Sequence, residues 1–390
     1  MNYILFDDSR ENLLPLTFTR PVCDIRVGIL TIREKWEKYL KAKTSTITET
    51  YLSAKYPLVS AKKNILINGS VCPNKNLLKE ILALKPETAL MSEETIIAVN
   101  TSNPLADWRG LRVRRETKAF SLYIKNLWDI FQKNGKAIED DFHLLTAGKK
   151  SQKISKTNQV INEKNIFLEQ GAKVECSILN AGTGPIYIGK DAEIMEGCLV
   201  RGPFSLGEHS QLKMGAKIYG PTTIGHESKV GGEVNNSVIF GFSNKAHDGF
   251  LGNSVVGEWC NIGADSNNSN LKNNYAHVRL WNYHQEKFEM TGLTFCGLIM
   301  GDHSKCGINT MFNTGTVVGV SANVFGTGFP RNFIPDFSWG GANGFSTYNP
   351  KDAFATAKLV YERRNKKFDD TEKNILNEVF MMTEKLRGQK

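Results

Sequence analysis

The sequence lacks the features of a membrane or secreted protein. No apolar stretch approaches the length of about 20 residues that spans a bilayer. The first eight residues, MNYILFDD, contain neither a basic segment nor a long apolar one of the kind that opens a signal peptide. The seven cysteines include no Cys-x-x-Cys pair, and their odd number argues for reduced thiols. We therefore expect a soluble, cytoplasmic protein without a membrane partner.

Charge of neither sign is concentrated in the chain. Its 390 residues carry a formal net charge of +9, and the 49 Lys and Arg residues are scattered. This distribution argues against a nucleic-acid partner and is compatible with anionic small molecules such as nucleotides or coenzyme A. The hydrophobic content of 41% is ordinary for a globular protein. The length allows two domains and a tail.

The second half of the chain repeats an aliphatic residue every six positions. A period of six fits neither an α-helix nor a strand pair. It is typical of a coil that returns to the same face of a triangular prism every third unit. We predict a left-handed parallel β-helix over residues 156–345, whose inward positions begin with Ile188, Ile194, Val200, Leu206, Leu212, Ile218, Ile224 and Val230, resume at Phe250, Val256 and Ile262, and return at Met300, Cys306, Phe312, Val318 and Val324.

The six-residue phase slips around residues 175–187 and 236–249, and it breaks at 271–293. We expect loops to leave the prism at these points, and loops on a rigid scaffold commonly carry function. The aromatic 271–293 excursion has two interpretations, a cover for a neighbouring subunit's site or a segment packed on its own prism. Residues 346–390 are expected to form two helices, starting at Asn349-Pro350 and at Asp369, that pack against the end of the prism.

The first 155 residues alternate strands with helical patterns. This order predicts an α/β domain with a largely parallel sheet. The expected strands are 3–6, 64–68 and 95–99, and the expected helices are 28–40 and 76–84.

Three stretches resemble a known family: Leu16–Pro21, Gly28–Trp36 and Gly326–Pro335. Together with the two-domain order, they resemble a diverged, Bacteroidetes-type branch of the bifunctional UDP-N-acetylglucosamine diphosphorylase/glucosamine-1-phosphate N-acetyltransferases. The resemblance implies a homotrimer that transfers an acetyl group from acetyl-CoA to an amino sugar or a sugar phosphate. It also implies a nucleotidyltransferase-like first domain whose ligand is a sugar phosphate or nucleotide sugar.

The acyltransferase half carries the family's histidine motif. Ala246–Gly252 and Asn261–Ala264 resemble the family's Gly-His-x-x-Tyr-Leu-Gly and Asn-Ile-Gly-Ala-Gly stretches. The resemblance implies that His247 is the general base, a role that suits an imidazole titrating near neutral pH. Phe250 stands in place of a sugar-binding Tyr, so the acceptor need not be a plain sugar 1-phosphate. The resemblance further implies substrate binding by Arg201, Asn235, Asn236, Phe250 and Asn270, and acetyl-CoA binding by Ala264, Ile308 and Gly326.

The nucleotidyltransferase half departs from the family's pattern. The loop 7–12 contains no glycine, whereas the family cradles a triphosphate with a glycine-rich loop. Ser70 stands near the place of the family's magnesium aspartate, so we assign no metal ligand, and Mg²⁺ is expected only if the domain is active. The candidate phosphate-binding cations are Arg10, Arg20, Arg26 and Lys35.

The departures in the nucleotidyltransferase half leave two interpretations open. One is an active nucleotidyltransferase, and the other is a catalytically dead domain within a trimeric scaffold that binds sugar nucleotide without turnover. A zinc-dependent β-helix carbonic anhydrase is disfavoured, because its ligands include a close pair of histidines and no two histidines here are five residues apart.

Overall fold

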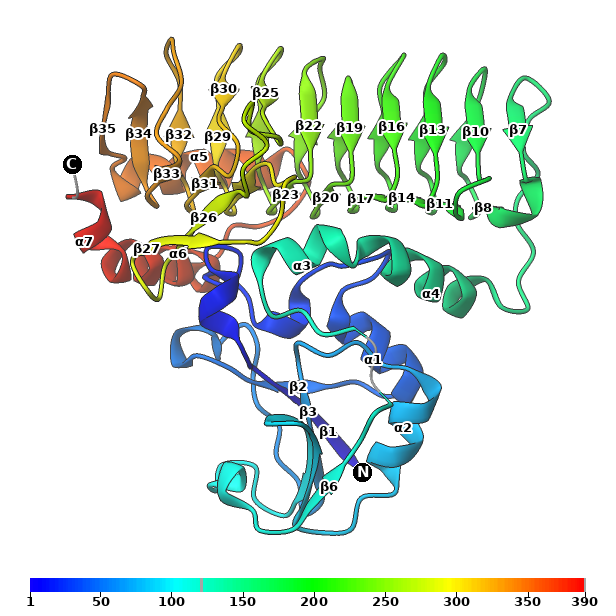
Figure 1. The fold of residues 1–390 in the computed structure, drawn as a ribbon, viewed down its shortest axis with the longest axis vertical. Helices are drawn as coiled ribbons and strands as arrows, with labels where there is room; N and C mark the ends of the chain where they lie inside the picture. Colours follow the sequence, from blue (N-terminus) through cyan, green and yellow to red (C-terminus); the bar gives the residue numbers. More distant parts are fainter. Residues whose placement is uncertain (120–121, 389–390) are drawn as a thin grey trace.

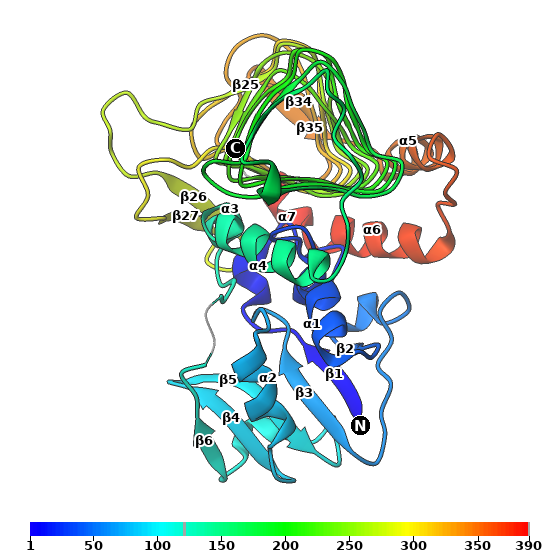
Figure 2. The ribbon, with the colours of Figure 1, turned by 90° about the vertical axis from the view of Figure 1, so that its right-hand side faces the viewer.

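A parallel β-helix and an α/β domain lie side by side in the computed structural model, which describes residues 1–119 and 122–388 (Figure 1). Viewed along its axis, the β-helix is a triangular prism (Figure 2). Its strands pair in parallel, so each coil stacks on the next. The predicted left-handed β-helix preceded by an α/β domain is confirmed.

The three faces of the prism are named by what covers them. The domain face, toward the α/β domain, comprises β8 (Ile166–Leu168), β11 (Ile186–Ile188), β14 (Phe204–Leu206), β17 (Thr222–Ile224), β20 (Val238–Ile239), β23 (Val255–Val256), β28 (Ile299–Met300), β31 (Val317–Val318) and β33 (Phe333–Ile334). The helix face comprises β9 (Lys173–Val174), β12 (Glu193–Ile194), β15 (Gln211–Leu212), β18 (Lys229–Val230), β21 (Asn244–Lys245), β24 (Asn261–Ile262), β29 (Lys305–Cys306), β32 (Asn323–Val324), β34 (Ser338–Gly341) and β35 (Gly344–Thr347). The open face comprises β7 (Gln159–Ile161), β10 (Ile178–Asn180), β13 (Leu199–Arg201), β16 (Lys217–Tyr219), β19 (Glu233–Asn235) and β22 (Phe250–Gly252), followed by the pair β25 (Asn267–Asn268) and β30 (Met311–Phe312).

The prism core is the predicted aliphatic column. The eight inward residues from Ile188 to Val230 are each at most 2% exposed, which confirms the six-residue phase. One later position was predicted wrongly: Phe250 lies partly exposed on the open face, and Leu251 is the inward residue at 2% exposure.

Short corners explain that error. The chain does not leave the prism around residue 240, as the phase slip suggested. Instead the inward positions Val230, Val234 and Ile239 follow at intervals below six, and the coils remain paired throughout. Gly232, with φ of +71°, makes one of these tight corners. These shortened corners bring Lys245 and Leu251 to inward positions. A further five-residue step from Leu251 to Val256 puts Phe250 out of phase.

The α/β domain is built on a six-stranded mixed sheet. The order is β2 (Ser45–Ile47), β1 (Asn2–Phe6), β3 (Asn64–Asn68), β5 (Thr95–Thr101), β4 (Thr88–Ser92) and β6 (Arg114–Glu116). The expected largely parallel sheet is only partly correct, since β5 runs antiparallel to both β3 and β4. The helices are α1 (Ile32–Leu40), α2 (Lys75–Leu82), α3 (Leu127–Gln132) and α4 (Asn134–Thr146), with short 3-10 turns at Arg10–Leu13, Val22–Asp24, Thr50–Leu52 and Trp108–Gly110, and a further one at Glu163–Asn165 before the prism.

Helix α1 begins four residues later than the predicted helix. Thr31 caps it, because its hydroxyl accepts from the backbone amide of Glu34 at 3.2 Å while the Glu34 carboxylate accepts from the amide of Thr31. Gly28, with φ of +79°, lies in the loop before that cap.

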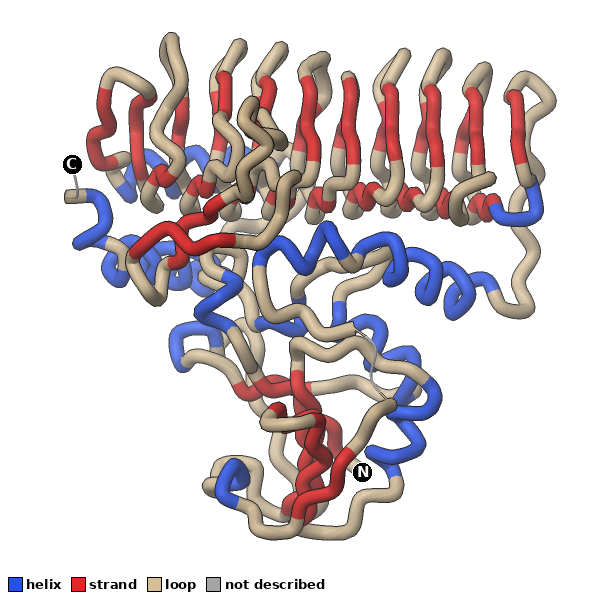
Figure 3. Tube along the Cα trace, viewed as in Figure 1, coloured by secondary structure: helices blue, strands red, loops and turns tan. Residues whose placement is uncertain are grey.

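The helices α3 and α4 lie between the two domains, along the domain face of the prism (Figures 1 and 3). The hydroxyl of Thr223 on β17 donates to the carbonyl of Gly28 at 3.0 Å. The side-chain oxygen of Asn134 lies 3.1 Å from the same hydroxyl, so the contact joins prism, loop and helix.

The excursion at 271–293 packs on its own chain. It forms a hairpin of β26 (Arg279–Asn282) and β27 (Lys287–Met290). Trp281 stacks on Phe333 with ring centroids 4.2 Å apart, and Tyr283 packs edge-on against Phe18 of the α/β domain at 5.2 Å. The hairpin therefore joins the two domains.

The tail contains the two expected helices and a short third one. They are α5 (Pro350–Glu362), α6 (Asp370–Met382) and α7 (Glu384–Arg387). The side chains of Asn349 and Asp369 cap α5 and α6, as predicted. Helix α5 runs beside the edge between the domain and helix faces (Figure 2). Within the described ranges, no helix has the length and apolar character needed to cross a membrane.

Candidate active site

The histidine motif lies along one edge of the prism, between the helix face and the open face. His247 follows β21, Ala264 follows β24, Ile308 follows β29 and Gly326 follows β32. These four strands are successive neighbours in the sheet, so the residues form a line with steps of roughly 4.8 Å. We call this line the His247 edge.

The exposure of the His247 edge suits ligand binding. His247 is exposed, and its imidazole has no hydrogen-bond partner within residues 1–119 and 122–388. Ile308 is 70% exposed, an unusual state for a large aliphatic side chain. The edge therefore offers a free base beside apolar surface.

A buried lysine supports the turn that carries His247. Lys245 is 2% exposed and occupies an inward position whose neighbours along the column are Val230 and Ile262. Its ammonium group donates to the carbonyl of His247 at 2.7 Å and to that of Gly231 at 2.9 Å. Burial lowers its pKa to about 8, against the opposing effect of the Asp248 and Asp265 carboxylates.

Lys245 was not among the predicted site residues. Lys245 is a charged residue at an inward position, where the repeat normally has an aliphatic side chain. The shortened corners before it shift the count, so the sequence alone does not show that the position is inward.

Three predicted substrate residues meet on the open face beside the His247 edge. Phe250 begins β22, and Asn235 on β19 pairs with Gly252. A Cβ atom on Gly252 would lie 2.5 Å from the Phe250 ring and 2.7 Å from the Asn270 amide nitrogen. The ring and the amide therefore lie over this glycine. The Asn270 amide also donates to the side-chain oxygen of Asn253 at 2.8 Å.

Asn236 follows Asn235 at the corner after β19, whereas Arg201 stands apart from that group. The side-chain oxygen of Asn236 is buried and has no hydrogen-bond partner among the described residues. Arg201 ends β13, two strands from β19, or roughly 10 Å along the face. It lines a separate pocket of about 200 Å³ with Lys217 and Tyr219.

The α/β domain has a polar cluster at the carboxyl ends of β1 and β3. The Asp8 carboxylate accepts from the Asn68 amide at 2.9 Å and from the Tyr123 hydroxyl at 2.7 Å. The Ser70 hydroxyl donates to the Asp8 carbonyl at 2.7 Å. Open α/β sheets bind ligands at this edge, so the cluster is the candidate nucleotide site of this domain.

The Asp7 carboxylate is occupied by partners within the protein. Its carboxylate accepts from the Val22 amide at 2.7 Å and pairs with Arg10 at 3.2 Å. Burial raises its pKa. Of the two aspartates after β1, Asp8 is the one whose surroundings resemble a ligand site. A single carboxylate with phosphate oxygens is a known way to hold Mg²⁺. No group of three or more His, Cys, Asp or Glu side chains in the described part of the chain could hold a metal ion.

The structure does not bring the predicted phosphate-binding cations together around an open site. Arg20 is buried and pairs with Asp302 and, at 3.3 Å, with Glu258 of the prism. Lys35 is buried against Asp141 of α4.

The other two cations also have protein partners. Arg10 donates to the Arg20 carbonyl at 2.9 Å, and Arg26 donates to the Ile29 carbonyl. Arg20 and Lys35 thus hold elements together, and sequence reasoning could not distinguish a carboxylate partner from a phosphate.

The fold and these residues define a two-domain protein in which a β-helix carries an edge of candidate acyl-transfer residues. Residues 3–150, the α/β domain, match the family model of sugar nucleotidyl transferases. The whole chain matches no curated protein sequence at a significant level.

Several solved acyltransferase structures are similar to part of this chain. UDP-N-acetylglucosamine acyltransferase of Arabidopsis is 16% identical, with 55% of this chain and 80% of that chain covered and a TM-score of 0.24. The Bacteroides fragilis enzyme of the same name is 12% identical, with 59% and 97% covered and a TM-score of 0.26. The Bacillus cereus N-acyltransferase AntD, in complex with dTDP and 3-hydroxybutyryl-CoA, is 15% identical, with 53% and 91% covered and a TM-score of 0.23. Similarities this low transfer no activity, so function must be argued from the residues.

Proposed function

We propose that the chain is an acetyl-CoA-dependent acyltransferase acting on an amino sugar or a sugar phosphate. The observation that supports this most is the His247 edge, where a free imidazole lies in line with Ala264, Ile308 and Gly326. The Phe250 ring lies on the adjoining open face. An apolar edge suits the pantetheine arm and its thioester, and an aromatic ring with amides beside it suits a sugar.

The proposed reaction uses His247 as the general base. The acceptor amine attacks the thioester carbonyl, and the neutral imidazole takes the proton that the amine loses. The tetrahedral intermediate then collapses with cleavage of the C–S bond, and the CoA thiolate leaves and takes up the proton. Lys245 keeps the His247 turn in place through the carbonyl of that residue.

The test is mass spectrometry of products from acetyl-CoA and a panel of amino-sugar phosphates. We expect one acetylated product, and we expect His247→Ala to lower kcat by about a hundred- to ten-thousandfold. Affinity for acetyl-CoA should be unchanged, since the base acts only as the amine loses its proton. The matched control is His209→Ala, an exposed histidine at another edge. A variant that keeps more than about a tenth of the wild-type rate would remove His247 from the mechanism.

A trimer is part of the proposal. The open face exposes apolar side chains, among them Ile161, Leu199 and Tyr219, and closed cyclic packing would cover them. Light scattering should give three times the chain mass of 43.6 kDa. A monomer at micromolar concentration would contradict the trimer.

For the α/β domain we propose binding of a sugar nucleotide without turnover. The supporting observation is that Arg20 and Lys35 are already paired with buried carboxylates. We expect no pyrophosphate release from UTP and N-acetylglucosamine 1-phosphate, but measurable binding of UDP-N-acetylglucosamine. Robust pyrophosphate release would instead establish an active nucleotidyltransferase.

A further inference from the structure

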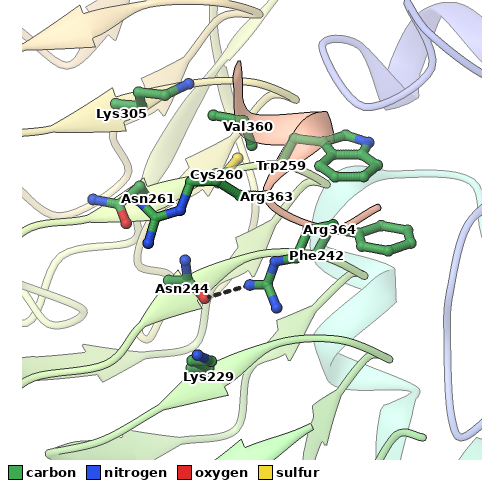
Figure 4. Close-up of a pocket in the computed structure, with 10 residues that line it drawn as sticks. All are labelled: Lys229, Phe242, Asn244, Trp259, Cys260, Asn261, Lys305, Val360, Arg363 and Arg364. Carbon is green, nitrogen blue, oxygen red and sulfur yellow. Dashed lines mark hydrogen bonds between the residues drawn. The ribbon is translucent and has the colours of Figure 1, made fainter. Parts of the chain in front are cut away.

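A second pocket lies on the helix face, where α5 packs against the prism (Figure 4). It has a volume of about 430 Å³. One wall consists of outward side chains from four neighbouring strands, and the other consists of the end of α5 and the residues just after it. The lining residues are Lys229, Phe242, Asn244, Trp259, Cys260, Asn261, Lys305, Val360, Arg363 and Arg364.

The lining contains four cationic side chains. Within residues 1–119 and 122–388, no carboxylate forms an ion pair with Lys229, Lys305 or Arg363. Arg364 donates to the Asn244 side-chain oxygen at 3.0 Å and lies 3.7 Å from the Glu227 carboxylate. Lys305 donates to the His303 carbonyl at 2.9 Å, so Lys229, Arg363 and Arg364 are the cations that face the single nearby acid, Glu227.

The cations repel one another. Burial lowers the pKa of Lys229, and Arg364, Lys213 and Arg363 lower it further. The local potential is thus positive, and an anion bound in this pocket would relieve the repulsion. A pocket that gathers like charges across two elements is costly without a ligand of opposite sign.

Stacked aromatic rings hold the two walls of the pocket together. Trp259 stacks on Phe242 at 4.0 Å and on Tyr361 of α5 at 3.9 Å. Tyr361 is buried and lies two residues before Arg363. The rings therefore position the arginines before any ligand arrives. Since both faces of Trp259 are covered, its ring is not available to stack on a nucleobase.

We propose that this pocket binds a phosphate-bearing anion of the size of a diphosphate or larger. Arginine and lysine are the usual ligands of phosphate oxygens, through charge-assisted hydrogen bonds. The volume exceeds that of a single inorganic phosphate, and the cations come from both walls, so several phosphate oxygens can be bound at once.

Two ligands share this chemistry. One is coenzyme A, and this choice of ligand rests on the proposed acyltransferase function. Asn261 and Lys305 lie in the pocket, and each precedes by three residues a member of the His247 edge, Ala264 and Ile308 respectively. That separation is roughly 10 Å along a strand, which the pantetheine arm can span. The other source is a nucleoside diphosphate or free pyrophosphate, which requires no acyl transfer.

The experiment combines calorimetric binding with kinetics. The full-length chain is titrated with pyrophosphate, UDP, CoA and pantetheine, and the same is done for the Lys229→Ala/Arg363→Ala double variant. We expect wild-type binding of the phosphate-bearing ligands, weakened roughly tenfold for each cation removed. Pantetheine, which has no phosphate, should be unaffected. The matched control is Lys358→Ala, a cation of α5 outside the pocket.

The kinetic measurements distinguish the two candidate ligands. If CoA is the ligand, the double variant raises KM for acetyl-CoA with kcat unchanged, and it leaves KM for acetyl-pantetheine unchanged. If UDP and pyrophosphate binding is lost while CoA binding persists, the source is a nucleotide. Equal affinities in wild type and double variant, or no binding of any of these ligands to the wild type, would overturn the proposal. Calorimetry decides this even if the wild type transfers no acyl group, so the two proposals fail separately.

Discussion

Replacing Lys245 by methionine is expected to stabilise the fold while impairing acyl transfer. Burial lowers the pKa of this lysine from 10.5 to about 8, so the charged amine costs the folded state about 3 kcal/mol at neutral pH. Methionine has a similar length and no charge. The two lost hydrogen bonds to the carbonyls of Gly231 and His247 offset about 1–2 kcal/mol of that gain. The net expectation is a rise of about 1–2 kcal/mol in the free energy of unfolding at pH 7.

The assay is urea denaturation of both proteins across pH. The pKa of Lys245 is lower in the folded state, so the unfolded chain binds more protons between pH 8 and 10.5. This lysine's cost is therefore fully present below pH 8 and disappears as the pH rises, so the gain from methionine should shrink over that window. Leu212→Met, in the same column, is the control without a pH-dependent effect.

The methionine variant also tests the role of the His247 turn. We expect kcat to fall at least tenfold with little change in KM for acetyl-CoA, because a displaced base lowers the rate of proton transfer. A destabilised variant, or a stability difference that does not depend on pH, would refute the claim that Lys245 is buried in its charged form. Unchanged kcat would refute the positioning of His247 by Lys245.

Three further predictions concern stability and are measured by urea denaturation. Arg20→Ala should cost about 3–5 kcal/mol, because Asp302 is left buried without its partner; an effect below 1 kcal/mol would refute the buried pair. Leu251→Ala should lower the free energy of unfolding by about 2–5 kcal/mol, and Phe250→Ala should lower it much less. The reverse order would mean that Phe250 is the inward residue. Burial raises the pKa of Asp336 to about 6, so its contribution to stability is full below pH 3.8 and is lost as the pH rises through 6. The stability of Asp336→Asn relative to wild type should therefore increase over that range, and a constant difference would contradict the raised pKa.

The repeat in the sequence determined the prism because its contacts are nearly local. Each inward residue, such as Ile188 or Leu206, packs on residues one coil away, so a six-residue period specifies both the face and the core. The same period places Ile308 and Gly326 three repeat units apart, after strands of one sheet. His247 and Ala264 join that line only in the structure, because shortened corners and the 271–293 excursion interrupt the count before and after them.

Corners and domain contacts were decided only by the tertiary structure. The short corners after Val230 and Val234 bring Lys245 into the core, and the one after Leu251 leaves Phe250 facing outward. A period count across a shortened corner cannot detect this. The arginine at position 20 is 282 residues from its partner Asp302. Its charge and spacing suit a phosphate as well as a carboxylate, and only the packing of the α/β domain along the prism selects the carboxylate. Similarly, the cations at 229, 305 and 363 become one pocket only because Tyr361 stacks on Trp259 and holds α5 across the helix face.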